Sequence, residues 1–223
     1  MLLYSYGFVK IMKTEIESFL EFAKHIEKLK NIERFKGHFY WKDYPQLERY
    51  ESVADHSWRV AMLVLLFQDK LSQKIDITKA IKMALLHDLA EIIAGDASPL
   101  GEDGTGKNSH AFNSQKAAER HEEELNAAQK LFSLLPAKIS KDLFDTWMEF
   151  EQQEKFEARF VKSLDRMEAM LQVLSYRQGH VFPEHLDFNI KYGLKGADVD
   201  PALTAFGQII AQEMKTKFRP FGK

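Results

Sequence analysis

The chain has 223 residues, of which 45% are hydrophobic and 29% charged, enough to bury a core and remain soluble. A net charge of −2 supplies no broad positive field, so we expect no nucleic-acid partner. The absence of cysteine excludes disulfides, thiolate catalysis and cysteine-ligated zinc, and it fits a cytoplasmic location.

The N-terminal segment is mildly apolar but carries no membrane or secretion signal. No apolar run approaches the roughly 20 residues of a membrane helix, so we expect no membrane partner. Residues 1–11 are too short and too interrupted for a secretory signal. Because Met12 directly precedes a helix-like segment, one hypothesis is that translation begins there. We therefore expect residues 1–14 to be a dispensable extension and residues 15–223 to be the folded domain, with a helical extension at its C-terminal end.

Hydrophobic periodicity predicts helices in the first half of the chain. Apolar residues at helical spacing indicate an amphipathic helix over 16–29. A loop rich in aromatic and charged residues follows, from about 33 to 52. A second helix is expected from Asp55, with a nearly continuous apolar run, and a third is expected from 77 until Gly95 ends it.

The second half is also predicted to be helical. Residues 96–108 contain three glycines and one proline and are expected to form a mobile loop. Helices are then expected over about 110–134, 138–152, 157–177 and, after a looser segment, 201–218. No repeat, linker or hairpin signal appears, so the expected fold is one all-α domain.

Four residues in three of these helices form the pattern H…HD…D, namely His56, His87, Asp88 and Asp165. Two imidazoles and two carboxylates are a mixed N/O ligand set for one divalent transition metal. Asp165 lies within an apolar stripe, where an unpaired carboxylate is costly. Water on such an ion becomes a nucleophile near neutral pH, so the pattern indicates hydrolysis, most naturally of a phosphate ester.

Two further carboxylates lie close to this pattern. Glu91 is at i+4 from His87 and i+3 from Asp88, on the same helix face. Asp96 follows the expected helix end, where it can face the same cavity. Taken singly, Glu91 reads as a solvated helix carboxylate and Asp96 as a turn residue. Single histidines and a chance HD pair are likewise common, and the joint pattern is what favours a site.

Three segments, 49–62, 84–99 and 158–172, resemble the HD-domain phosphohydrolases. More narrowly, they resemble the 5′-deoxynucleotidase branch and the HD-domain-containing protein 2 type. The resemblance implies a single HD-domain helical bundle with the metal site between its core helices. It also implies one divalent transition metal (Mn or Co, otherwise Fe, Ni, Zn or Cu), a nucleotide substrate and a homodimer.

The same resemblance implies roles for individual residues. The four residues of the H…HD…D pattern would ligate the metal. Glu91 would activate the attacking water, and Asp96 would contact substrate and assist proton transfer. Residues 97–99, with Ser98 among them, would lie along the nucleotide.

The chain departs from the family upstream of the first histidine, where bacterial members carry an Arg-Trp pair. Counting back from that histidine gives Trp41 and Lys42 instead. Lys42 would meet phosphate as a point charge, and Trp41 would pack on the sugar or anchor the loop. Arg59, one turn after the histidine, is another candidate phosphate ligand, and Arg34 and Arg49 are further alternatives.

The expected function is metal-dependent hydrolysis of (deoxy)nucleoside 5′-monophosphates to nucleoside and phosphate. One alternative is an HD phosphohydrolase for another small phosphorylated metabolite, or a phosphodiesterase. A single H…HD…D set, with no second pair of ligands evident, favours the monoesterase. The other alternative is a non-catalytic nucleotide-sensing module, and a water activator at Glu91 counts against it.

Overall fold

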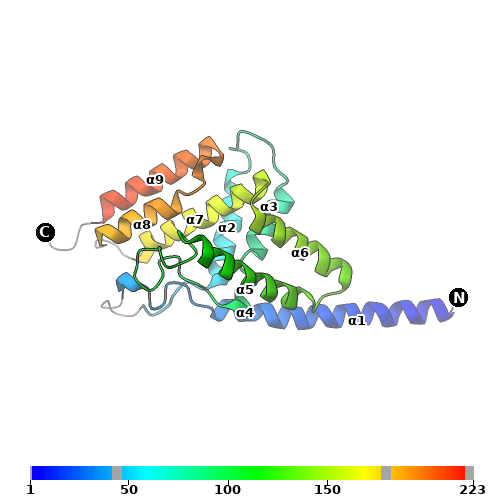
Figure 1. Cartoon of the computed structure of the whole chain (residues 1–223). Helices are drawn as coiled ribbons and strands as arrows, with labels where there is room; N and C mark the ends of the chain where they lie inside the picture. The colour runs from blue at the N-terminus through cyan, green and yellow to red at the C-terminus, as the bar shows by residue number, and fades with distance from the viewer. Residues whose placement is uncertain (1, 42–46, 177–181, 219–223) are drawn as a thin grey trace.

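The computed structural model describes residues 2–41, 47–176 and 182–218. In these residues the chain is helical, without β-strands, and one isolated bridge pairs Glu33 with Ser52. The elements follow the order α1 (Leu2–Ile26), η1 (Glu27–Asn31), η2 (Phe39–Trp41), α2 (Val53–Phe67), α3 (Ile77–Leu86), α4 (Glu91–Ala94), α5 (Ser114–Phe132), α6 (Ala137–Gln152), α7 (Phe156–Tyr176), α8 (Pro183–Gly193), η3 (Ala197–Val199) and α9 (Pro201–Lys217) (Figure 1). The predicted all-α class is confirmed.

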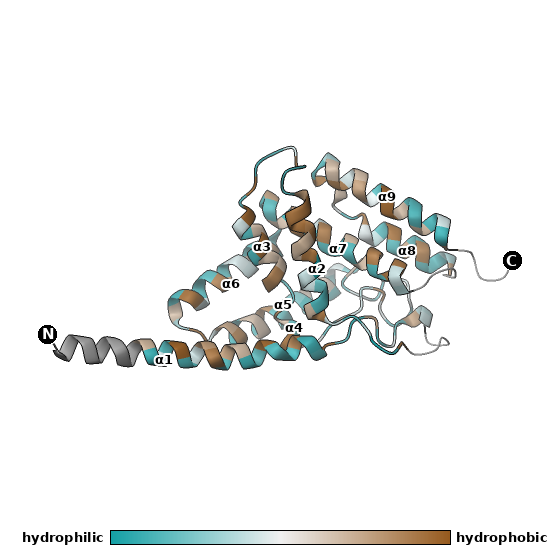
Figure 2. Cartoon of the chain, turned by 180° about the vertical axis from the view of Figure 1, so that it is seen from behind, coloured by the Kyte–Doolittle hydropathy of each residue, from teal (hydrophilic) through white to brown (hydrophobic). Residues whose placement is uncertain are grey.

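Helix α7 is the centre of the bundle and packs against α2, α3, α6, α8 and α9 (Figure 1). Its apolar stripe is fully buried at Phe160, Val161, Leu164 and Met167. Burial of each such side chain contributes about 1.5–3 kcal/mol. Figure 2 shows that α2, which packs on α7, is also largely hydrophobic. Asp165 lies beside the buried stripe, so the packing of α7 determines where its carboxylate is presented.

A capping box fixes the start of α2. The Ser52 hydroxyl accepts a hydrogen bond from the Asp55 N–H at 3.1 Å, and the Asp55 carboxylate accepts one from the Ser52 N–H at 2.9 Å. Such reciprocal bonds satisfy two helix-end donors at once. His56 follows immediately in the first turn and is completely buried.

The single helix predicted from 77 to 95 is interrupted at the His87-Asp88 pair. In a continuous α-helix the His87 carbonyl would accept from the Glu91 N–H. Instead it accepts from the indole N–H of Trp147 on α6 at 3.0 Å, while the Glu91 N–H donates to the Asp88 carbonyl at 3.0 Å. This tighter i→i+3 bonding separates α3 from α4. A distant tryptophan therefore determines the local backbone at the pair.

The segment between α4 and α5, predicted to be mobile, is packed against the body of the protein. Leu100 and Ala111 of this segment are buried against Phe188. Phe188 belongs to α8, a helix that forms where the sequence predicts a looser segment before residue 201. Gly106 has a positive φ of 73°, and a β-carbon there would lie 2.6 Å from the Phe188 ring. Glycine is therefore required at this close approach.

Helix α1 runs without interruption through the predicted boundary at residue 14. Its N-terminal part extends beyond the other helices (Figure 1). Phe22 stacks on Phe132 with ring centroids 6.3 Å apart, whereas Ile16 and Leu20 are each 56% exposed. None of the helices within the described residues combines enough length and apolar character to cross a lipid bilayer.

Candidate metal centre

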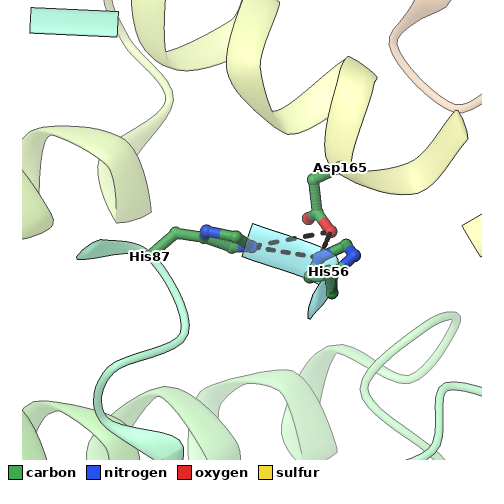
Figure 3. A group of neighbouring side chains, drawn as sticks. All are labelled: His56, His87 and Asp165. Carbon is green, nitrogen blue, oxygen red and sulfur yellow. Dashed lines mark hydrogen bonds and ion pairs between the residues drawn. The ribbon is translucent and has the colours of Figure 1, made fainter. Parts of the chain in front are cut away.

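Three side chains from distant parts of the chain converge between the helices (Figure 3). His56 comes from α2, His87 from the end of α3 and Asp165 from α7. The Nε2 atom of His56 lies 3.2 Å from Nε2 of His87 and 3.1 Å from Oδ1 of Asp165. Nε2 of His87 lies 3.8 Å from the same carboxylate oxygen. The three ligand atoms therefore face a common point.

Asp88 completes this group. Its Oδ2 atom lies 3.1 Å from Nε2 of His87 and 3.5 Å from Nε2 of His56. The structure thus brings together all four residues that the sequence predicts as ligands. The tight turn after α3 makes this possible, because it directs the neighbouring side chains His87 and Asp88 to the same side.

The spacing of the donor atoms suits a single divalent ion. Two ligands at right angles around an ion, with bonds of about 2.1 Å, are about 3.0 Å apart. The separations of 3.1 to 3.8 Å between His56, His87 and Asp165 are close to that value. With two imidazoles and two carboxylates, the set matches a transition metal better than calcium or magnesium.

The charges of the group also fit a cation. Burial opposes the charged form of His56, but Glu168 and Asp165 outweigh it and raise the pKa of His56 to about 10. Burial likewise opposes ionisation of Asp165, yet Lys162 and the histidines hold its pKa well below the ordinary range. Positive charge is therefore favoured between these carboxylates, whether a proton or a metal supplies it.

The backbone holds the His87 ring in place. Its Nδ1 lies 3.0 Å from the carbonyl oxygen of Ala84. A carbonyl only accepts, so Nδ1 carries the proton and donates, which leaves the Nε2 lone pair directed at the centre.

A cavity of about 280 Å³ opens next to the centre. This volume is close to that of small-molecule sites, which begin at roughly 300 Å³. Its walls include the carboxylates of Glu91 and Asp96 and a set of basic side chains, namely Arg34, Arg120, Lys162, Arg166 and Lys195. Basic walls beside a cation site favour an anionic ligand.

Glu91 and Asp96 face this cavity as predicted. Burial and the neighbouring Asp88 and Asp96 raise the pKa of Glu91 well above its ordinary value. Burial also raises the pKa of Asp96. The Oε2 atom of Glu91 has no hydrogen-bond partner within the described residues, while Arg120 lies 3.9 Å from Oε1. Glu91 is therefore an available proton acceptor beside the centre.

The predicted substrate contacts are distributed differently from expectation. Trp41 is 6% exposed and stacks on Phe35 in the core, away from the cavity wall. The guanidinium of Arg59 bonds to buried side chains behind His56, so it does not face the cavity. Ser98 is outside the wall of this cavity and lines two neighbouring spaces, of about 50 and 640 Å³. Lys42 lies outside the described residues.

Sequence reasoning missed Lys162 and Glu168. Both are three residues from Asp165 on α7, one on either side, so the spacing was a usable signal. The ammonium of Lys162 lies 2.9 Å from Oδ2 of Asp165, and the carboxylate of Glu168 accepts from Nδ1 of His56. Arg34, one of several alternatives for phosphate, is the one that lines the cavity.

Comparison with known proteins agrees with the family that the sequence motifs indicate. The family model described as HD domain matches residues 26–206, which include the four ligands. The 5′-deoxynucleotidase HDDC2 of Xenopus laevis is 37% identical over 162 residues, 73% of this chain and 71% of that protein. The 5′-deoxynucleotidase HDDC2 of Homo sapiens is 34% identical over 159 residues, 71% of this chain and 68% of that protein.

Solved structures share the fold. A crystal structure described as a predicted metal-dependent phosphohydrolase from Magnetospirillum magnetotacticum has a TM-score of 0.67 at 23% identity. It covers 93% of this chain and 100% of its own. The PH0347 protein of Pyrococcus horikoshii has a TM-score of 0.59 at 22% identity, covering 86% and 98%.

Proposed function

The chain belongs to the HD-domain family, and we propose that it is a metal-dependent phosphohydrolase that converts deoxynucleoside 5′-monophosphates to nucleosides and inorganic phosphate. One observation carries the proposal: two buried histidines and two aspartates meet at the wall of a cavity rich in basic groups. The relatives named 5′-deoxynucleotidase support the substrate class.

Four residues would hold the metal, namely His56, His87, Asp88 and Asp165. When bound, a divalent ion supplies Lewis acidity toward the phosphate oxygens and makes coordinated water acidic enough to attack near neutral pH. Mn²⁺ or Co²⁺ is the first choice because of the resemblance to the HD-domain phosphohydrolases. A set of nitrogen and oxygen donors without thiolate also accommodates Fe, Ni, Zn or Cu.

Glu91 would take the proton of the attacking water. A general base works best when its pKa lies near the working pH, and burial with two carboxylate neighbours shifts the pKa of Glu91 in that direction. Glu91 lines the cavity, and its buried Oε2 atom has no competing hydrogen-bond partner in the described residues. Asp96 would contact the substrate and pass on protons.

Arg34 would bind the phosphate, while Lys42, which lies outside the described residues, stays a candidate for the same role. Its guanidinium lines the cavity together with Asp88 and Asp96, and it is always charged. Lys162 adds a second positive charge beside the Asp165 carboxylate. A phosphate between these cations would be neutralised from two sides, which favours the negatively charged transition state.

The nucleoside would extend past Asp96 and Ser98 toward the loop between α4 and α5. Pro99, His110 and Ala111 of this loop line the same cavity, as does Tyr192 of α8. Burial lowers the pKa of His110 to about 4, so its imidazole is neutral and able to form hydrogen bonds with a base.

We also propose a homodimer and a dispensable N-terminal extension over residues 1–14. Ile209 on α9 is 64% exposed, and Ile16 and Leu20 on α1 are also exposed, so apolar surface is available for association. Analytical ultracentrifugation of the full chain and of a chain beginning at residue 15 tests both points. A monomer, or loss of folding on truncation, would reject the corresponding proposal.

Phosphate release from each deoxynucleotide and its ribonucleotide counterpart tests the function. Metal-stripped protein is resupplied with Mn²⁺, Co²⁺, Mg²⁺ or Zn²⁺, and the Asp88→Ala variant controls for contaminating phosphatases. Release from deoxy substrates, absent in the variant, is the expected result. Sugar phosphates are assayed in the same way, and cleavage of cyclic dinucleotides, which frees no phosphate, is followed by chromatography. Turnover of only these compounds would reject the deoxynucleotide substrate class. Nucleotide binding without any turnover would support the alternative, a non-catalytic nucleotide-sensing module.

A further inference from the structure

Glu168 is a fully buried carboxylate behind the metal centre. It follows Asp165 by three residues on α7, which places both on the same side of the helix. The imidazole of His56 lies between them. Its Nε2 faces Asp165, and its Nδ1 faces Glu168.

Both oxygens of Glu168 are occupied. Oε2 accepts from Nδ1 of His56 and lies 3.3 Å from Nη1 of Arg34, while Oε1 accepts from Nε of Arg59 at 2.5 Å. An ionised carboxylate only accepts, so the Nδ1 proton of His56 is committed to it. The ring is then unable to turn, and Nε2 is the nitrogen presented to Asp165 and His87.

The two arginines make a buried charge tolerable at this position. A carboxylate removed from water is strongly disfavoured unless it is paired. Arg34 and Arg59 both contact Glu168, so the buried carboxylate is paired with two cations.

We propose that Glu168 is a positioning residue of the metal centre, holding the His56 imidazole through Nδ1 so that Nε2 meets the ion, with Arg34 and Arg59 holding Glu168 in turn. Carboxylates that orient a metal-bound histidine in this way typically account for 10- to 100-fold in metal affinity. The inference rests on the metal site of the proposed function. Glu168 acts through His56 and does not reach the cavity wall.

Glu51 provides a matched control within the same network. It is also buried, and it accepts from Arg34 and Arg59 at 3.2 Å each. Its side chain bonds to these arginines and contacts Glu168, and it makes no hydrogen bond to His56. Burial and the neighbouring Glu168 raise the pKa of Glu51 to about 8, so glutamine is a close substitute for its neutral form.

The experiment compares the metal affinity of the wild type with that of Glu168→Gln, Glu168→Asp and Glu51→Gln. Glutamine keeps the shape of Glu168 but turns one oxygen into an NH₂ group that opposes an arginine or the His56 N–H. Aspartate keeps the charge but is one methylene too short to reach His56. Mn²⁺ affinity is measured by competition with a chelating dye, and the coordination geometry by the visible absorption of the Co²⁺ form. Urea unfolding of the metal-free proteins reports stability separately.

Both Glu168 variants are expected to bind Mn²⁺ roughly 10- to 100-fold more weakly and to change the Co²⁺ spectrum, with Glu51→Gln within about threefold of the wild type. If one Glu168 variant fails to fold, the other carries the comparison. Unchanged affinity and spectrum in a folded Glu168 variant would overturn the inference, even if urea stability fell, because that pattern indicates an ordinary buried ion pair. A wild type that binds neither metal would instead overturn the proposed function.

Discussion

Substitution of Glu91 by glutamine separates proton transfer from metal binding. The side chain is 11% exposed, and Oε2 has no partner in the described part of the chain, so an amide fits without displacing a neighbour. A positioned general base typically contributes 10²- to 10⁴-fold to the rate. We therefore expect kcat to fall by roughly 10²- to 10⁴-fold, equivalent to about 2.7–5.4 kcal/mol of transition-state stabilisation.

The same substitution is expected to stabilise the metal-free protein. Burial, Asp88 and Asp96 raise the pKa of Glu91 above its ordinary 4.5, so the folded state binds this proton more tightly than the unfolded chain does. The cost of the buried carboxylate is absent below 4.5 and grows as the pH rises through the folded pKa. Glutamine removes this cost, so Glu91→Gln should resist urea better than the wild type at neutral pH and equally at acid pH.

Three measurements check this reasoning. Phosphate release is followed across pH with saturating Mn²⁺, Mn²⁺ affinity is measured by dye competition, and urea unfolding is recorded in EDTA. The exposed Glu122→Gln serves as the control. Retention of more than about a tenth of wild-type kcat would refute the general-base role. Lower stability of Glu91→Gln at neutral pH would refute the electrostatic argument.

Three further predictions follow from the site. Adding Mn²⁺ should raise the Tm of the wild type but not of Asp88→Ala, because only a bound ligand stabilises the folded state; equal shifts would place the metal elsewhere. Arg34→Lys should raise KM more than it lowers kcat, because lysine lacks the bidentate fork. The exposed Arg49→Lys variant is the control, and its steady-state kinetics should equal those of the wild type. Trp147→Phe should lower the free energy of unfolding by about 1–3 kcal/mol, because the His87 carbonyl loses its buried donor; an unchanged urea midpoint would contradict the account of the α3–α4 turn.

Local sequence patterns were sufficient for the fold class and for the four candidate ligands. An apolar stripe at helical spacing predicts the core-facing side of α7, because a helix repeats every 3.6 residues whatever surrounds it, and a nearly continuous apolar run predicts that α2 lies in the core. The H…HD…D residues could be recognised because an imidazole or carboxylate beside an apolar stripe needs a partner. The structure brings these four residues together.

Local sequence patterns could not predict which distant segments come into contact. Trp41 and Arg59 lie at suitable distances along the chain, yet one packs in the core and the other bonds to Glu168 behind His56. Arg34 is further from the histidine in sequence, but it lines the cavity. Counting residues across a loop fails because loop length does not determine which side chain returns to the site.

The sequence alone therefore determined most of the helices and the donor types of the centre, since helical spacing and ligand type are properties of neighbouring residues. It did not predict the break between α3 and α4 or the helix α8. The tertiary structure decided the geometry. Trp147, 60 residues from His87, breaks the helix at the HD pair, and Glu168, 112 residues from His56, holds its ring. Packing of the helices brings these partners close to one another. Burial then removes the water that would otherwise satisfy each polar group, so the groups bond to each other.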